Sequence, residues 1–293
     1  MNSRSALAPV LATVIGIGLF SAMDAYMKGA ALAVGAYSAV LLRNVAGTLL
    51  VLPWWLWNGR KIPARATLRV HVKRSAVVAV MALAFFFSLT RLPLAEAIAL
   101  SFIAPLIALY LAALLLGETV ERKAVIGAVL GLGGVVVIVG SKLGRETLTE
   151  DMLVGLAALL FSALLYAWNL VIQREQALIA GPGEVAFFQS GLVALALLPG
   201  APFLLQWPDQ AALVQIGTGA VLAVGALLTL TWAYARAEAQ VLVPVEYTGF
   251  LWAALFGWLM FAEPLTGGTV AGTVLIVIGC WIATRKRPEQ SAL

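Results

Sequence analysis

The sequence has few charged residues. Only 11% of its 293 residues are Asp, Glu, Lys or Arg, whereas 62% are apolar. Soluble domains have about a quarter of their residues charged, so a soluble fold is excluded. The apolar residues come in long blocks instead of alternating with polar ones, which predicts transmembrane helices and excludes a transmembrane β-barrel. The net charge of +5 lies in the loops and not on a soluble basic face, so nucleic-acid binding is not expected.

Cysteine and histidine are almost absent. The one cysteine, Cys280, lies inside the last apolar block, which excludes a disulfide framework and a thiolate metal cluster. The one histidine, His71, stands in the basic loop stretch HVKR, and we expect a solvated or headgroup-facing side chain there. HExxH and GxSxG motifs are also absent, which argues against an intramembrane enzyme. We predict no cofactor and no metal site.

A repeat organises the chain. The stretch LLLGETVERKAVIGAVLGLGGVVVIVG, which begins at Leu114, recurs 145 residues later as LMFAEPLTGGTVAGTVLIVIGCWIATR. This offset places Glu118 on Glu263, and the same register without a gap places Arg91 on Arg236. We therefore predict two homologous halves, residues 1–145 and 146–293.

The apolar blocks predict an all-α integral membrane protein with ten transmembrane helices. The predicted spans are residues 7–27, 35–57, 70–90, 94–116, 123–140, 152–173, 182–204, 211–233, 241–261 and 267–284. The first resembles a signal peptide, but removing it would leave one half a helix short, so we take it as a retained span. Lysine and arginine are concentrated in the loops on one side, which predicts that both termini are cytoplasmic. Five spans per half is an odd number, so the second half is expected to be inverted, as in many secondary transporters.

Polar residues inside the spans are the candidate site, because ionisable side chains there are costly and usually face a cavity. The repeat pairs Ser21, Asp24 and Lys28 of the first span with Tyr166, Asn169 and Gln173 of the sixth. The alternative is that these residues form hydrogen bonds or ion pairs between helices, for instance between Asp24 and Arg43. The predicted substrate-binding residues are Asp24, Arg43, Ser101, Tyr166, Trp168, Asn169, Gln189, Glu246 and Tyr247.

Spans five and ten are rich in glycine. Gly127, Gly131 and Gly134 in one, and Gly268, Gly272 and Gly279 in the other, form small-residue faces for close packing. We expect these spans to be structural, either at the edge of the bundle or at a homodimer seam.

The twin motifs LGETVERKAVIGAVLGLGGVVVIVG and FAEPLTGGTVAGTVLIVIG, with the intramembrane arginine of YSAVLLRNVAG, resemble the EamA-type branch of the drug/metabolite transporter superfamily. The resemblance covers essentially the whole chain. It is greatest to the bacterial exporters of aromatic and other neutral amino acids. It implies a central cavity among spans one to four and six to nine, and a multi-pass protein of the bacterial inner membrane.

The sequence therefore predicts a secondary transporter that exports small metabolites, neutral and aromatic amino acids first, by alternating access around a central cavity. Its partners would be that substrate and the lipid bilayer. A flippase or carrier for lipid-linked sugars or another metabolite of the same superfamily is the alternative, and an intramembrane enzyme is a third. The sequence leaves the direction of transport and the coupling ion open.

Overall fold

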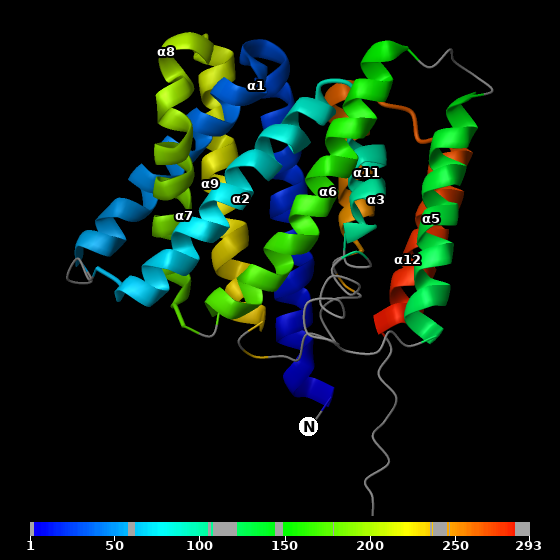
Figure 1. Cartoon of the computed structure of the whole chain (residues 1–293), viewed down its shortest axis with the longest axis horizontal. Helices are drawn as coiled ribbons and strands as arrows, with labels where there is room; N and C mark the ends of the chain where they lie inside the picture. Colours follow the sequence, from blue (N-terminus) through cyan, green and yellow to red (C-terminus); the bar gives the residue numbers. More distant parts are fainter. Residues whose placement is uncertain are drawn as a thin grey trace, which may run out of the picture.

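The computed structural model describes residues 3–57, 62–104, 107, 122–143, 149–177, 179–234, 236, 245 and 247–284. Every regular element in these ranges is a helix (Figure 1). The helices are α1 (Ser3–Trp57), α2 (Arg65–Leu89), α3 (Leu94–Ser101), α5 (Arg122–Leu143), α6 (Glu150–Ala177), α7 (Pro182–Leu197), the short 3-10 turn η1 (Leu198–Gly200), α8 (Ala201–Leu204), α9 (Gln210–Tyr234), α11 (Gly249–Phe261) and α12 (Gly267–Thr284).

Five of these helical segments are long and apolar enough to cross a membrane, and three shorter ones are apolar. Each predicted span overlaps a described helix, but α2 begins at Arg65, five residues before the start predicted for the third span. The second part of the fourth span, except residue 107, and the start of the ninth, residues 241–244, lie outside the described residues, and with them Pro105 and Pro244.

The first two predicted spans form the two arms of α1. At about 1.5 Å per residue, a straight helix of this length would be far longer than the roughly 30 Å of hydrocarbon. The chain reverses instead at Gly35, where φ is 76° and ψ is 155°. This is a conformation that essentially only glycine adopts, since a Cβ atom would clash with the backbone. The first arm rises from the N-terminus, and the second arm descends at an angle, away from the first (Figure 1).

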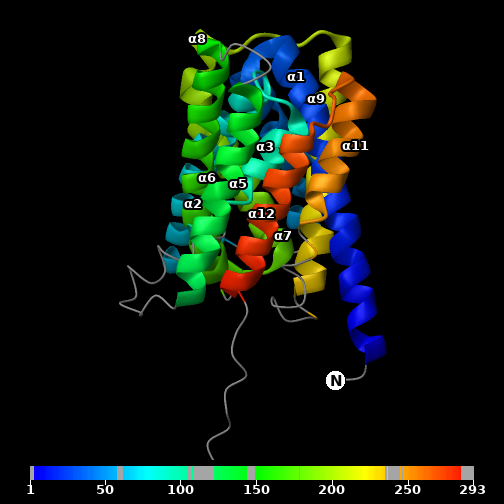
Figure 2. The same ribbon diagram turned by 90° about the vertical axis from the view of Figure 1, so that its right-hand side faces the viewer.

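The helices form one bundle (Figures 1 and 2). The first arm of α1 packs along α9, as the close approach of Gly16 to Leu230 and of Gly219 to Met27 shows. The second arm packs on α7, where Trp55 stacks on Phe187 at 4.6 Å between ring centroids. α2 packs on both α6 and α7, and α3 packs on α11.

Glycines join α5 and α12 at one side of the bundle (Figure 2). A Cβ atom on Gly134 would lie 2.5 Å from the carbonyl oxygen of Gly272, and one on Gly279 would lie 2.6 Å from that of Gly127. Under the offset of 145 residues, Gly134 corresponds to Gly279 and Gly127 to Gly272, so the second contact is the first with the halves exchanged. The two equivalent helices therefore run antiparallel. The glycine faces pack against each other within the chain, and a homodimer through these spans stays a prediction.

The outward faces are apolar. On α5, Val129, Leu132 and Val136 are all exposed and stand at helical spacing on one side. Such a surface is unfavourable in water and suits lipid, so the bundle has the surface of a multi-pass membrane protein.

The turn at Gly35 makes a testable prediction. A Cβ atom there would meet nothing within 4 Å, so Gly35→Ala strains only the backbone. We expect it to lower the free energy of unfolding by about 1–3 kcal/mol, measured by thermal unfolding in detergent. Gly217→Ala is the control, because Gly217 lies inside α9 and also has open space around its Cβ position. The control should unfold at the same temperature or higher, and an equal loss in both variants would contradict the prediction.

Candidate functional site

At the upper end of the bundle in Figure 1, where α1 reverses, a lysine and a glutamate form a nearly buried ion pair. Lys28 on α1 contacts Oε1 of Glu263, and only 6% and 15% of the two side chains are exposed. The Lys28 ammonium also donates to the backbone oxygen of Leu92 at 2.7 Å. The other carboxylate oxygen of Glu263 accepts the backbone N–H of Leu94, the first residue of α3, at 2.7 Å. A negative charge is favourable at this helix start. One carboxylate thus holds three segments together.

The end of α11 places Glu263 in this position. Ala262 adopts the left-handed conformation with φ 53°, and the N–H of Glu263 then donates back to the oxygen of Gly257 at 3.2 Å. The left-handed residue thus ends the helix and folds the chain back over its last turns. A Cβ atom on Gly257 would lie 2.7 Å from the Glu263 carboxylate, so glycine leaves the room that the carboxylate needs.

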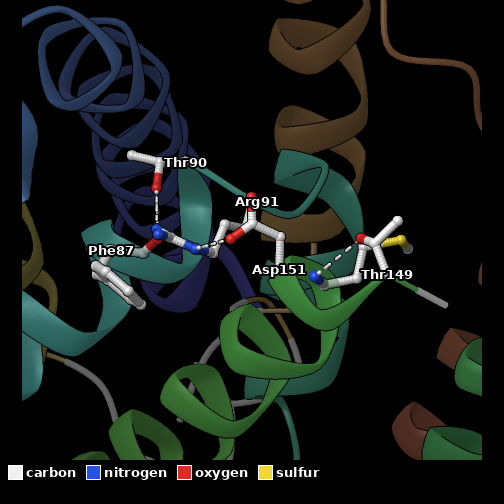
Figure 3. A network of polar contacts seen from close by, with 6 residues as sticks. Phe87, Thr90, Arg91, Thr149 and Asp151 are labelled. Carbon is white, nitrogen blue, oxygen red and sulfur yellow. Dashed lines mark hydrogen bonds and ion pairs between the residues drawn. The ribbon is translucent and has the colours of Figure 1, made fainter.

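A second contact at the same end joins α2 to α6. Figure 3 shows Arg91 between Phe87, Thr90 and Asp151. Its guanidinium lies 3.8 Å from the centroid of the Phe87 ring, donates to the Thr90 hydroxyl at 2.9 Å, and places Nε 3.4 Å from Oδ1 of Asp151. Arg236 stacks on Trp232 in the same way at 4.3 Å, one repeat later. Asp151 is 80% exposed, so this ion pair is well solvated and weak.

At the opposite end of the bundle, five side chains form a polar network, four of them buried and the fifth, Glu184, 31% exposed. The Arg74 guanidinium donates to Oδ1 of Asn169 at 3.0 Å and to Oε1 of Gln176. The amide nitrogen of Gln176 lies 2.6 Å from Nδ1 of His71, and Nε2 of His71 lies 3.0 Å from Oε1 of Glu184. The imidazole also stacks on Phe188 at 5.2 Å. The network joins α2 to both α6 and α7.

This network corrects the prediction for His71, whose side chain is not in a solvated loop but has no exposed surface. Because α2 already begins at Arg65, His71 lies within the helix, and its buried face runs through Arg74, Ser75 and Val78. The spacing i, i+3, i+4, i+7 is visible in the sequence and marks one helical face. The neighbouring basic residues led to the loop prediction, although this spacing marks a helix.

Asp24 and Arg43 lie deeper, one on each arm of α1, and both are half-buried. The positive charge of Arg43 acts on the Asp24 carboxylate. Among the residues that the structure describes, however, Asp24 has no hydrogen bond and no ion pair within 4.0 Å. In Arg43, Nε is buried and has no hydrogen-bond partner. The two charges are therefore near each other but are not joined in a direct ion pair.

The other predicted site residues are divided between places. Asn169 belongs to the Arg74 network. Tyr166, which lies on α6 like Asn169, is beside the Arg74 guanidinium. Gln189, on α7, is half-buried and has a buried side-chain oxygen without a hydrogen-bond partner. Trp168 points away from the bundle, with 44% of its surface exposed.

The last three predicted residues lie at or near the ends of α3 and α11. Ser101 ends α3 and donates to the oxygen of Ala97 in its own helix at 2.8 Å. Tyr247 is half-buried and lies edge-on to Phe102 at 5.2 Å. Glu246 lies outside the described residues, as does Glu118.

Comparison with known proteins identifies the family. The sequence profile of the EamA-like transporter family matches residues 7–140 and again residues 153–285. The chain belongs to this family. It is therefore a membrane transporter of the EamA type.

Relatives of known name move different metabolites. The chain is 27% identical over 284 residues to the pseudopaline exporter CntI of Pseudomonas aeruginosa, an alignment that covers 95% of this chain and 96% of the relative. It is 23% identical over 272 residues to an S-adenosylmethionine uptake transporter of Rickettsia felis, covering 89% and 90%. A solved crystal structure with 22% identity superposes with a TM-score of 0.63 and covers 97% of both chains, which shows the fold alone.

Both polar networks connect the two segments that the family profile matches. Lys28 and Leu94 belong to the first segment and Glu263 to the second. At the other end, His71 belongs to the first segment, whereas Gln176 and Glu184 belong to the second. The sequence analysis paired Glu118 with Glu263 but assigned neither a partner.

The ion pair of Lys28 with Glu263 makes a prediction about stability. Lys28→Met leaves the carboxylate without its cation in a nearly buried place, so we expect the free energy of unfolding to fall by about 3–5 kcal/mol. Denaturant or thermal unfolding in detergent would measure the loss. The double variant K28M/E263M removes both charges and should recover much of it.

The matched control is Asp151→Asn, which breaks the exposed ion pair with Arg91 at the same end and should cost no more than about 1 kcal/mol. Equal losses in Lys28→Met and Asp151→Asn would show that the Lys28 pair is no more important than a surface contact.

Proposed function

We propose that the protein is a secondary transporter that exports small metabolites carrying both an amino and a carboxyl group, with neutral and aromatic amino acids as the first candidates. It would work by alternating access between two inverted halves, residues 1–145 and 146–293. Both termini would be cytoplasmic, and the membrane would be the bacterial inner membrane.

The observation that carries the substrate class is the pair of separated charges on α1. Asp24 and Arg43 are opposite in sign, half-buried and not directly paired. Ionisable residues within membrane spans usually face the bundle interior or a water-filled cavity. A carboxylate at one place and a guanidinium at another match the ammonium and the carboxylate of a zwitterion, and each would gain a charge-assisted hydrogen bond.

Further polar and aromatic groups support the same substrate class. The buried oxygen of Gln189 has no hydrogen-bond partner and could accept from a substrate ammonium. Tyr247 and Phe102 lie edge-on to each other and half-buried, as a wall for an apolar side chain would. A pocket of this composition would bind the polar end of an amino acid by charge and its side chain by apolar contact.

The α5–α12 contact supports the inverted arrangement of the halves. Its two glycine contacts are related by exchange of the halves, and the equivalent helices are antiparallel. The family profile also matches twice, once in each half. Two structurally similar halves in opposite orientation give two bundle conformations of similar energy, one open to each side, as alternating access requires.

The names of the relatives widen the set of substrates to test. One relative is a pseudopaline exporter and another is an S-adenosylmethionine uptake transporter. The family thus contains both directions of transport. S-adenosylmethionine itself carries an amino and a carboxyl group, which agrees with the proposed substrate class.

The test is transport in proteoliposomes that contain the purified protein. The panel would include labelled phenylalanine, leucine, alanine and S-adenosylmethionine, with lactate and putrescine as compounds that carry only one of the two groups. We expect at least one zwitterion to exchange across the membrane and neither lactate nor putrescine to do so. Transport of lactate or putrescine alone would overturn the substrate class, and no transport of any compound would count against the proposal as a whole.

Variants of the charge pair make the test specific. Asp24→Asn and Arg43→Gln each remove one of the two charges, so each should reduce exchange about tenfold or more. Asp151→Asn removes an exposed carboxylate far from α1's two arms in sequence and should leave exchange unchanged. If Asp24→Asn and Arg43→Gln transport as well as the unmodified protein, the charges do not bind the substrate.

A further inference from the structure

The network around His71 has a fixed order of donors and acceptors. The guanidinium of Arg74 can only donate, so the side chain of Gln176 must present its oxygen to Arg74. The amide nitrogen of Gln176 is then turned toward His71, where it donates to Nδ1. Nδ1 is thereby the acceptor of the ring, so the proton of the neutral imidazole lies on Nε2 and is donated to Glu184. Every hydrogen bond in this chain fits one protonation state of His71.

Protonation of His71 breaks this order. A second proton on Nδ1 would face the N–H of the Gln176 amide, so two donors would oppose each other. Turning the amide would satisfy His71 but would present its nitrogen to the Arg74 guanidinium, which opposes two donors there instead. No arrangement of these three side chains satisfies a protonated ring, and His71, Gln176 and Arg74 are all buried. An unsatisfied buried donor is costly, so the contact must separate.

The other groups around His71 determine whether its protonation is favoured. From α7, Glu184 faces Nε2 and would favour a charged imidazole, while the ring of Phe188 covers one side. From α6, the described side chains at the network are the amides of Asn169 and Gln176 and the phenol of Tyr166. From α2 itself, Arg74 is the cation on the same buried face, one turn away, while Arg69 and Lys73 are exposed. Glu184 therefore attracts the proton that the bond to Gln176 cannot accommodate.

We propose that His71 is a proton-binding site whose protonation opens the contact between α2 and the helices α6 and α7. Because this network joins the two halves at one end of the bundle, the proton would control access from that end. The inference rests on the proposed alternating access and adds a coupling ion and a site for it. It places proton coupling at His71, whereas Asp24 and Arg43 bind the substrate.

The test measures how accessible the contact is at different pH. Ser75 lies one turn after His71 on the same buried face of α2, so a cysteine there reports when the face opens. In the full-length protein with Cys280→Ser and Ser75→Cys, the rate of alkylation by N-ethylmaleimide is measured in detergent. The same measurement with His71→Gln provides the comparison, and the ratio of the two rates removes the effect of pH on the thiol itself.

We expect the ratio to rise about tenfold from about pH 8 to about pH 5.5, a range in which an imidazole ordinarily takes up a proton, because the comparison variant lacks this imidazole and keeps every other titratable group. Ala79→Cys, on the next turn of the same buried face, is the second reporter if Ser75→Cys does not fold. A ratio that does not change with pH would overturn the proposal.

Gln176→Glu makes the prediction sharper. A carboxylate at this position accepts from both Arg74 and a protonated His71, so the doubly protonated ring would now fit the network. We expect acidification to protect the reporter in this variant instead of exposing it. A purely structural role of His71 predicts no such reversal, and the same rise on acidification in Gln176→Glu as in the parent would overturn the assignment of donors and acceptors.

Transport measurements separate this inference from the proposed function. In proteoliposomes, His71→Gln should still exchange the zwitterion that the unmodified protein exchanges, but at a rate independent of pH. If no compound is transported while alkylation follows pH as expected, the proposed function fails and the proton site stands. If exchange is found and its pH dependence is the same in His71→Gln, the proton site fails and the proposed function stands.

Discussion

The cost of a charge in a low-dielectric interior governs how the two halves of this bundle are held together. A lysine or a glutamate that leaves water inside a membrane protein must find a partner of opposite charge and must also satisfy its remaining hydrogen bonds. Lys28 and Glu263 meet this condition with each other, with Leu92 and with Leu94. Because these groups come from different halves, separating the halves at that end would leave both charges without a partner. The two halves can therefore meet at this end only in an alignment that brings Lys28 and Glu263 together.

The two ends of the bundle use different chemistry for the same task. One end relies on an ion pair supported by backbone groups, while the other relies on hydrogen bonds in which the amide of Gln176 and the imidazole of His71 link Arg74 to Glu184. An ion pair between lysine and glutamate keeps its charges over most of the physiological pH range, whereas an imidazole changes its charge within that range. The ends would consequently respond differently to acidification, and only the His71 end would sense it.

The sequence predicted the helices well because a helix that spans a membrane needs a long run of apolar residues. Long apolar blocks place α1, α6, α9 and α12, and the repeat directed attention to Glu263 before any partner was known. The partner could not be predicted, because Lys28 is 235 residues away from Glu263 and only packing brings them together. His71 was misplaced for a different reason. The basic residues near it are typical of a loop, yet Arg65, Arg69 and Lys73 lie on the exposed side of a helix, and Arg74 shares the buried face with His71. In the candidate site, the repeat placed Asp24 and Asn169 at equivalent positions, but only the structure showed that Asn169 binds Arg74.

The paired contacts of α5 and α12 have a consequence for the origin of the interface. A contact that maps onto itself when the halves are exchanged is the kind that two copies of one polypeptide form across a two-fold axis. Gly134 against Gly272 and Gly279 against Gly127 have this relation inside a single chain. Two separate five-helix chains of identical sequence, inserted in opposite orientations, could form the same seam without a covalent link. In this protein both equivalent contacts lie within one chain, so positions that correspond under the repeat can differ, as lysine at position 28 differs from glutamine at position 173.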